Sequence, residues 1–265
     1  MTIQAEVLPT YRKFRKIGIQ LNHKLVETLS KETIYEGGRR LGILQDDKLV
    51  FDYEDHISIV MDYCIHNGWV DGQNAIQRYR EQSPPPSGSD ELVLLTAMLE
   101  SHYALAEVLK TDPGVGVTVR DHLRGETHSL ADIGMSQTAR RGDAFATRLF
   151  SLEEAGFVMT GGAALPVTPQ VFTLIRRELD QKFGAETDFA QLNPDQEADL
   201  TASIIRICLE AGMGSHVAYG TAAEQPSRTP RGIDRRAARL GNPNDACPCG
   251  SGRKLKSCCG RRPRR

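Results

Sequence analysis

The stretch GVGVTVRD, residues 114–121, decides the fold class of this chain. Val115, Val117 and Val119 recur at every second position, which is the period of a β-strand with one buried face. PGVG, residues 113–116, opens the alternation and is typical of a turn. The stretch therefore predicts a strand that leaves a tight turn.

More short strands are predicted on the C-terminal side of this one. ETHSLADIG (126–134), AFATRLFS (144–151) and AGFVMTGG (155–162) each have strand character. LRGE (123–126) and RRGD (140–143) supply turns between them. Four or five short strands with turns at such intervals favour a small, strongly curved antiparallel sheet or barrel.

Helices are predicted before the sheet. Residues 8–82 have apolar residues at helical spacing, and Gly37-Gly38 is predicted to interrupt them. A second helix is expected from about Asp52, and a short one is expected to end at Gln82. The apolar face of the second helix comprises Ile57, Val60, Met61, Cys64 and Ile65.

Helices are also predicted after the sheet. Residues 168–184 form one, with Thr168 as its N-cap and Pro169 as its first residue. Residues 195–214 form another, ended by glycine. The fold class is therefore α+β, with a helical N-terminal region, a small sheet or barrel and C-terminal helices.

Charge is distributed unevenly along the chain. Residues 221–265 hold twelve Lys or Arg and three acidic residues, a net charge of +9. Because the whole chain carries −1, residues 1–220 carry −10. An acidic body with a basic tail predicts that the tail meets an anionic partner. No apolar run is long enough for a bilayer and no secretory signal is seen, so we expect a cytoplasmic protein without membrane insertion.

Four of the six cysteines lie within thirteen residues of the tail. They are Cys247, Cys249, Cys258 and Cys259. A disulfide between adjacent cysteines closes a strained ring, and coincidence is a poor account of such crowding. Two thiolate pairs joined by one turn instead offer a tetrahedron of soft ligands, which suits one structural Zn²⁺. A Cys₄ site has no open coordination position, so we expect no catalysis there.

The run NDACPCGSGRKLKSCCG, residues 244–260, resembles the SEC-C motif. This zinc-binding motif was first recognised at the C-terminus of the translocation ATPase SecA. The resemblance implies that the four tail cysteines are the zinc ligands and that the tail engages a protein or a ribosome. FDYEDHISIVMDYCIHNG (51–68) and MTGGAALPV (159–167) are similar to stretches of uncharacterised bacterial proteins that also end in SEC-C.

These patterns divide the chain into successive segments. They are a helical region (1–82), a linker (83–90), a helix with the small sheet (91–167), helices (168–218), a basic tether (219–244), a zinc knuckle (245–260) and a basic tail (261–265). The basic residues expected to contact a partner or phosphate are Arg235, Arg236, Arg239, Arg253, Lys254, Lys256, Arg261 and Arg262. The tail has no aromatic residue for base stacking, so any nucleic-acid contact is expected to be non-specific.

The body offers one cluster of candidate ligands. Asp55, Asp62 and His66 share the polar face of a helix and could bind a second metal. The simpler interpretation is a capped helix with a solvated polar face. Neighbouring Ser-His and Asp-His pairs at 101–102 and 121–122 indicate little, because catalytic triads assemble in space. Cys64 and Cys208 are predicted to be buried core thiols.

Three functions are compatible with these features. The first is an adaptor that docks a protein or ribosomal partner through the zinc knuckle. The second is an RNA- or DNA-associated protein that uses the arginine-rich tail. The third is a metal-dependent enzyme that uses the body cluster. The cysteine spacing favours the first.

Overall fold

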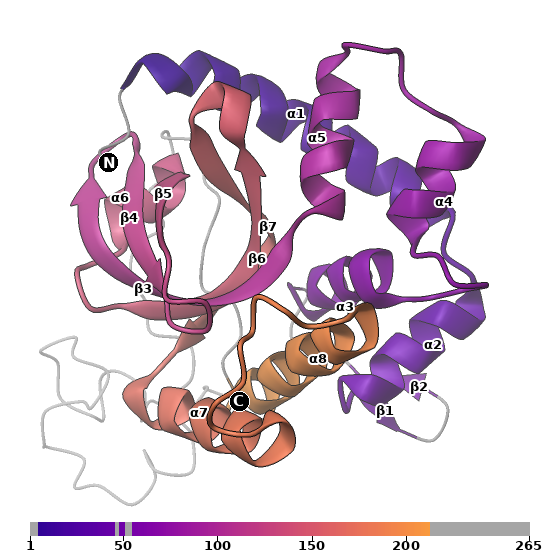
Figure 1. The fold of residues 1–265 in the computed structure, drawn as a ribbon, viewed down its shortest axis with the longest axis vertical. Helices are drawn as coiled ribbons and strands as arrows, with labels where there is room; N and C mark the ends of the chain where they lie inside the picture. The colour runs from indigo at the N-terminus through magenta and orange to yellow at the C-terminus, as the bar shows by residue number, and fades with distance from the viewer. Residues whose placement is uncertain (1–4, 46–47, 51–54, 213–265) are drawn as a thin grey trace, which may run out of the picture. The chain divides into compact units, whose positions relative to one another are not determined.

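The computed structural model describes residues 5–45, 48–50 and 55–212, whose elements are shown in Figure 1. The helical N-terminal part comprises the 3₁₀ turn η1 (Ala5–Val7), α1 (Leu8–Glu27), α2 (Lys31–Arg40), the two-stranded sheet β1 (Leu44–Gln45) and β2 (Lys48–Leu49), α3 (Asp55–Asn67), α4 (Ala75–Gln82) and α5 (Asp90–Leu99). None of the helices in these ranges is long and apolar enough to cross a membrane.

A closed five-stranded barrel follows, in the order β3-β4-β5-β7-β6. Its elements are β3 (His102–Asp112), β4 (Gly116–Asp121), β5 (Thr127–Ala131), α6 (Ile133–Thr138), β6 (Ala144–Leu152), the 3₁₀ turn η2 (Glu153–Ala155) and β7 (Phe157–Val167). Neighbouring strands are antiparallel except β5 and β7, which pair in parallel at Leu130 and Val158. The α+β class and the small barrel are confirmed, with this parallel pair closing it.

Local capping fixes where the later helices begin. Thr168 Oγ1 accepts a hydrogen bond from the Val171 amide, and α7 (Pro169–Phe183) starts at the next residue, as predicted. α8 (Pro194–Glu210) is preceded by Asn193, which forms a capping box with Gln196. Proline in the first turn suits both helices, since an amide there has no partner within the helix.

The glycine pair at 37–38 does not interrupt a helix, contrary to the prediction. Both glycines are buried inside α2, because the helix packs closely on its neighbours. A Cβ on Gly37 would lie 2.4 Å from Cys64 Sγ, and one on Gly38 would lie 2.2 Å from a methyl carbon of Leu49. The glycines therefore serve close packing rather than chain reversal.

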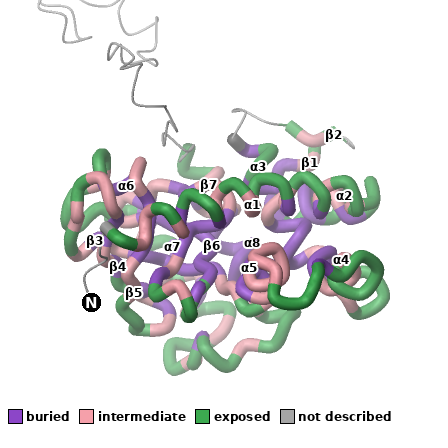
Figure 2. The backbone as a smooth tube through the Cα atoms, turned by 90° about the horizontal axis from the view of Figure 1, so that it is seen from above, coloured by how far each residue is buried: buried purple, intermediate pink, exposed green. Residues whose placement is uncertain are grey.

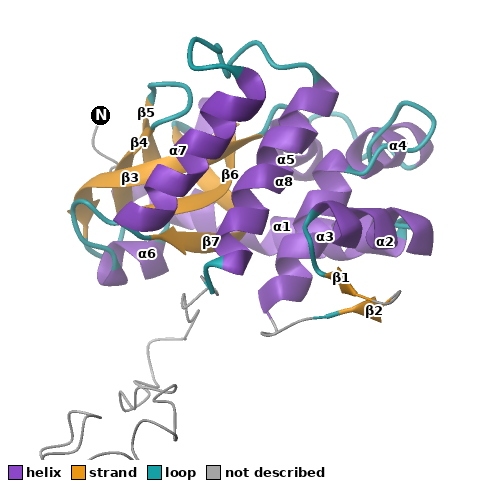
Figure 3. Ribbon diagram, turned by 90° about the horizontal axis from the view of Figure 1, so that it is seen from below, coloured by secondary structure: helices purple, strands orange, loops and turns teal. Residues whose placement is uncertain are grey.

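Buried residues form three core clusters, one of them built mainly from barrel strands. Figure 2 marks the buried positions along the backbone, and Figure 3 shows the helices packed beside the barrel strands. Of the other two clusters, one joins the barrel to α3, α7 and α8, and the other joins it to α1 and α5. Cys64 and Cys208 are both fully buried, as predicted. Ile57 is 46% exposed, so the predicted apolar face of α3 is one turn too long.

Candidate functional site

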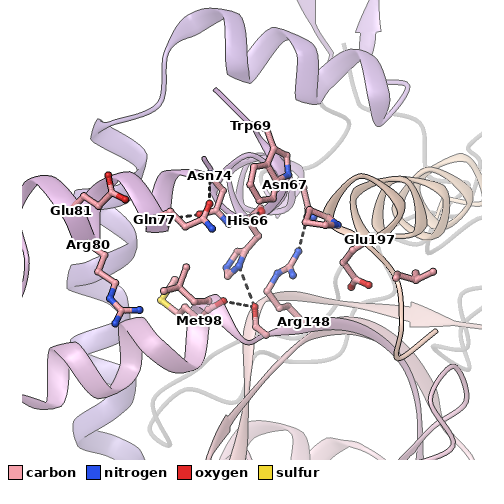
Figure 4. A pocket seen from close by; sticks show the side chains of 14 residues that line it. His66, Asn67, Trp69, Asn74, Gln77, Arg80, Glu81, Met98, Arg148 and Glu197 are labelled. Carbon is pink, nitrogen blue, oxygen red and sulfur yellow. Dashed lines mark hydrogen bonds between the residues drawn. The ribbon is translucent and has the colours of Figure 1, made fainter. Parts of the chain in front are cut away.

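A pocket of about 650 Å³ lies where α3, α4, α5 and α8 meet strand β6 of the barrel (Figure 4). That volume is in the range of small-molecule sites. The lining residues are His66, Asn67, Trp69, Asn74, Gln77, Arg80, Glu81, Met98, Leu99, Ser101, Arg148, Leu192, Pro194 and Glu197. The wall therefore combines charged groups with apolar side chains.

Arg148 is the largest fully buried side chain of the described body. It sits in the middle of β6, and its Nε donates to Asp62 Oδ2 at 3.1 Å. Its Nη2 donates to Asn67 Oδ1 at 2.8 Å, and the guanidinium lies 5.7 Å from the Tyr103 ring centroid. A buried guanidinium needs such partners, because an unpaired charge in the interior is costly. These hydrogen bonds connect the last turns of α3 to strand β6 of the barrel.

His66 lies beside this ion pair on α3. Its Nδ1 is 3.2 Å from Ser101 Oγ, and its Nε2 is 3.8 Å from Asp62 Oδ1. Burial lowers the pKa of His66 well below its usual value, and the charge of Arg148 lowers it further. The imidazole is therefore neutral at pH 7.

Several acceptor atoms around the pocket already accept hydrogen bonds from protein groups. Glu197 Oε1 accepts from the Tyr103 amide at 3.1 Å, and its Oε2 accepts from Arg124 Nη2 at 3.0 Å. Glu81 Oε1 accepts from Gln73 Nε2. Among the donors of the described residues, Trp69 Nε1 is buried without a hydrogen-bond partner, whereas Arg80 is exposed to solvent.

A second polar group lies in the barrel beside Tyr103. Asp121 is fully buried, and its Oδ1 accepts from the amides of Leu105 and Leu123. Its Oδ2 lies 3.5 Å from Arg124 Nη1 and 3.8 Å from His102 Nε2. Burial lowers the pKa of His102 to about 3, with further lowering from the nearby arginines and His128. His102 is therefore held as a neutral base.

Two parts of the sequence match known families. Residues 5–183 match a family of unknown function, DUF7986. The chain belongs to the DUF7986 family. Residues 244–261 match the SEC-C motif, a type of motif associated with zinc binding. The chain is thus a DUF7986 body followed by a SEC-C motif.

Curated relatives share only a small part of the chain. The translocase subunit SecA of Rubrobacter xylanophilus is 44% identical over 45 residues, which cover 17% of this chain and 5% of that protein. SecA of Syntrophomonas wolfei is 29% identical over 83 residues, which cover 31% of this chain and 10% of that protein. The chain spans a tenth or less of these relatives. No solved structure matches it.

The DUF7986 body brings two of the three predicted metal-binding residues together. Asp62 and His66 face each other, whereas the side chain of Asp55 lies outside the described residues. No group of three or more His, Cys, Asp or Glu side chains in the described ranges is placed to hold a metal ion. The Ser-His and Asp-His neighbours also separate, since Ser101 contacts His66 and Asp121 faces His102.

Sequence reasoning missed Arg148 and Trp69, which both line the pocket. Arg148 interrupts the apolar run AFATRLFS (144–151), and a charge at a core position is the signal that could have found it. The four tail cysteines and the basic residues predicted to contact a partner, from Arg235 to Arg262, lie outside the described residues.

Proposed function

We propose that this protein is an adaptor that binds one structural Zn²⁺ through its tail cysteines and docks a protein or ribosomal partner with the resulting knuckle. The supporting observation is the SEC-C match at residues 244–261. That match contains Cys247, Cys249, Cys258 and Cys259. Four thiolates form the donor set that Zn²⁺ prefers, and the ion would supply the folding energy of a segment too short for a core.

The charge of the tail supports an anionic partner. Residues 221–265 carry +9, and the arginines and lysines stand on both sides of the cysteine pairs and between them. An acidic protein surface or ribosomal RNA would meet this charge favourably. Four thiolates also require a reducing compartment, so the proposal places the protein in the cytoplasm.

The geometry of the body argues against the metal-enzyme alternative. Asp62 Oδ2 is bound to Arg148, so this carboxylate is already neutralised by a buried cation. A metal ion at His66 and Asp62 would lie beside a fixed positive charge. The adaptor function therefore has better support than a metal centre in the body.

Zinc analysis and ribosome co-sedimentation test the proposal on three full-length proteins. They are the wild type, a variant with all four tail cysteines changed to Ser, and a charge variant with Arg261, Arg262, Arg264 and Arg265 changed to Gln. We expect one zinc per wild-type chain, none in the cysteine variant, and loss of partner capture in the cysteine variant with the body still folded. The charge variant should keep its zinc and lose its salt-sensitive binding.

Two results would contradict the proposal. Equal zinc content in the wild type and the cysteine variant would show that the four tail cysteines do not bind the ion. If the cysteine variant captured the partner as well as the wild type does, the zinc knuckle would not be the docking site. Binding that follows the arginines alone, and equally with any RNA or DNA, would instead favour the nucleic-acid alternative.

A further inference from the structure

The barrel strands follow one another in an order that indicates where a ligand could lie. Counted along the chain, the first, second, third, fifth and fourth strands lie side by side, and the fourth pairs with the first. The third and fifth strands, β5 and β7, pair in parallel, and α6 lies between the third and fourth strands. A five-stranded Greek-key barrel with this order is the OB-fold, whose second and third strands form the face that binds oligonucleotides or oligosaccharides.

The second and third strands of this barrel, β4 and β5, share an outer face. Thr118 pairs with Ser129 and Arg120 pairs with Thr127, so these side chains lie on the same side of the two strands. Arg120 and Thr127 are exposed to solvent, and Thr118 and Ser129 are half-buried. The valines that alternate with them on β4 belong to the barrel core. The outer face is therefore polar.

Most of the helices lie against other parts of the barrel. α3, α5, α7 and α8 pack on β3, β6 and β7, whereas α6 packs against β4 and contributes Met135 to the barrel core. Figure 1 shows β4 and β5 on the side of the barrel away from α3 and α8. The outer face of β4 and β5 is thus open to another molecule.

Cations gather along one side of this face. Lys110 is the neighbour of Thr118 on β3. Arg140 and Arg141 are exposed and belong to the turn whose backbone bonds the same strand at its bulge. Together with Arg120, they place three exposed guanidinium groups and one ammonium group around the outer face. We call these four residues the basic wall.

The acidic residues beside the basic wall have partners of their own. Glu107 Oε2 lies 2.7 Å from His122 Nε2, and Asp112 Oδ1 lies 2.8 Å from Lys110 Nζ. Asp143 Oδ2 accepts from the Arg140 amide at 2.8 Å. Residues 1–220 carry −10, so a wall with three exposed guanidinium groups departs from the average of the body. Its charge favours an anionic partner.

The side chains of the wall select among the ligands that such a barrel can bind. Because one fold hosts many functions, the strand order points to the face, and its side chains decide the ligand. Guanidinium and hydroxyl groups donate to phosphate oxygens, which favours an oligonucleotide over a neutral oligosaccharide. Neither β4 nor β5 contains Phe, Tyr or Trp for base stacking, so contact is expected with the backbone rather than with the bases.

The shape of the face favours a single strand over a duplex. Duplex readers commonly insert a helix or a two-stranded ribbon into a groove, whereas the basic wall lies on the curved side of a closed barrel. Barrels of this kind bind single strands in a cationic groove that follows the phosphates.

We propose that the basic wall binds the sugar–phosphate backbone of a single-stranded nucleic acid without sequence preference. Arg120, Arg140 and Arg141 contact phosphates, and the hydroxyls of Thr118 and Thr127 donate to the same backbone. The site lies in the body and uses neither the zinc ligands nor the tail arginines. It can therefore stand or fail independently of docking through the zinc knuckle.

Fluorescence anisotropy of a labelled oligouridylate of about twelve nucleotides measures this binding, since one OB barrel covers about 4–16 nucleotides. The full-length protein carries the tail changes of the charge variant, which lower the contribution of the tail to RNA binding. We expect a Kd below about 100 μM at about 50 mM salt, and an affinity that falls as the salt concentration rises.

Two double variants in that background localise the binding. Arg120→Gln/Arg141→Gln should weaken it by about tenfold or more and lower the steepness of its salt dependence by about 1.4, since each phosphate contact of a single strand contributes about 0.7. Arg12→Gln/Lys16→Gln is the matched control, because it removes two positive charges from exposed positions of α1. It should leave the salt dependence unchanged.

A conservative variant separates charge from shape. Arg120→Lys/Arg141→Lys should keep most of the oligouridylate binding, because lysine also binds phosphate as a point charge. The wall variants should retain one zinc per chain, so their outcome leaves the zinc test of the docking proposal unaffected.

Four results would overturn the proposal. The first is no oligouridylate binding at low salt, and the second is equal weakening by the wall variant and the α1 control. The third is tighter binding of an RNA duplex of the same length than of the single strand. The fourth is loss of oligouridylate binding when only the four tail cysteines are changed to Ser, which would assign RNA binding to the zinc knuckle.

Discussion

Arg148 Nε lies 3.1 Å from Asp62 Oδ2, and this bond joins residues that stand 86 positions apart in the chain. The arginine side chain is 2% exposed and the aspartate side chain 12%, so both charges are largely removed from water. Breaking a buried pair by removing one partner leaves the other charge uncompensated. The pair therefore couples the stability of α3 to that of the barrel.

We expect Arg148→Met to lower the free energy of unfolding by about 3–5 kcal/mol, because Asp62 would stay buried without its cation. Urea denaturation measures the change. The exposed pair Lys13–Asp90 is the control, since Lys13→Met should cost under about 1 kcal/mol. If Arg148→Met and Lys13→Met lowered the free energy of unfolding by similar amounts, burial of the Arg148–Asp62 pair would not make that pair more important for stability.

Gly37→Ala should destabilise the protein by about 1–3 kcal/mol, because its Cβ would lie 2.4 Å from Cys64 Sγ. Gly18→Ala is the matched helical control. Its Cβ would meet only a methyl carbon of Leu94 at 3.5 Å, so alanine should stabilise α1 by about 0.5–1 kcal/mol. Thermal melting compares the two, and the double variant Gly37→Ala/Cys64→Ala should recover part of the loss. If Gly37→Ala left the melting temperature unchanged, the close contact of Gly37 with Cys64 would be contradicted.

Stability should decline as the pH falls below about 6.5, in part because of His102. Its pKa is about 3 in the folded body and near 6.5 when unfolded, so between these values only the unfolded chain takes up the proton. The stabilisation is complete above about pH 6.5 and is lost progressively toward about pH 3. At pH 5 the loss from this residue is roughly 2 kcal/mol.

His102→Asn tests this, because it removes the titrating group. Urea midpoints measured between pH 5 and 7 should change less with pH in the variant than in the wild type. His23→Asn, at an exposed position of α1, serves as the control and should keep the wild-type slope. If His102→Asn kept that slope as well, neutral burial of His102 would not be the cause.

A chain that ends at Tyr219 should keep the melting temperature of the full-length protein within a few degrees. All three core clusters are built from residues between Val7 and Leu209. A domain that closes its own core folds without its tail. Differential scanning calorimetry measures the comparison. A large drop on truncation would mean that residues 220–265 stabilise the body.

Several features that adjacent residues define follow from the sequence, whereas contacts between distant residues do not. Thr168 and Pro169 marked the start of α7 because a helix N-terminus is defined by adjacent residues. The alternation in 114–121 found β4 for the same reason, and it indicated a barrel. The SEC-C run was recognisable because its cysteine spacing is local.

Other features of the fold and the site depend on contacts with residues that are distant in sequence, and a local pattern does not identify those residues. Gly37 looked like a helix breaker, because its reason for being glycine is Cys64 on another helix. The role of Arg148 depends on Asp62 and Asn67, which lie far from it in sequence. The parallel pairing of β5 with β7 likewise depends on how the barrel closes.

The closure of that barrel restricts how other molecules can attach to the body. Every one of its five strands is paired on both sides. The four antiparallel pairings leave an extended peptide no free backbone edge on which to add a strand, which also protects against edge-to-edge aggregation, and the parallel seam of β5 and β7 pairs at Leu130 and Val158. Away from that seam, recognition by the barrel relies on side chains.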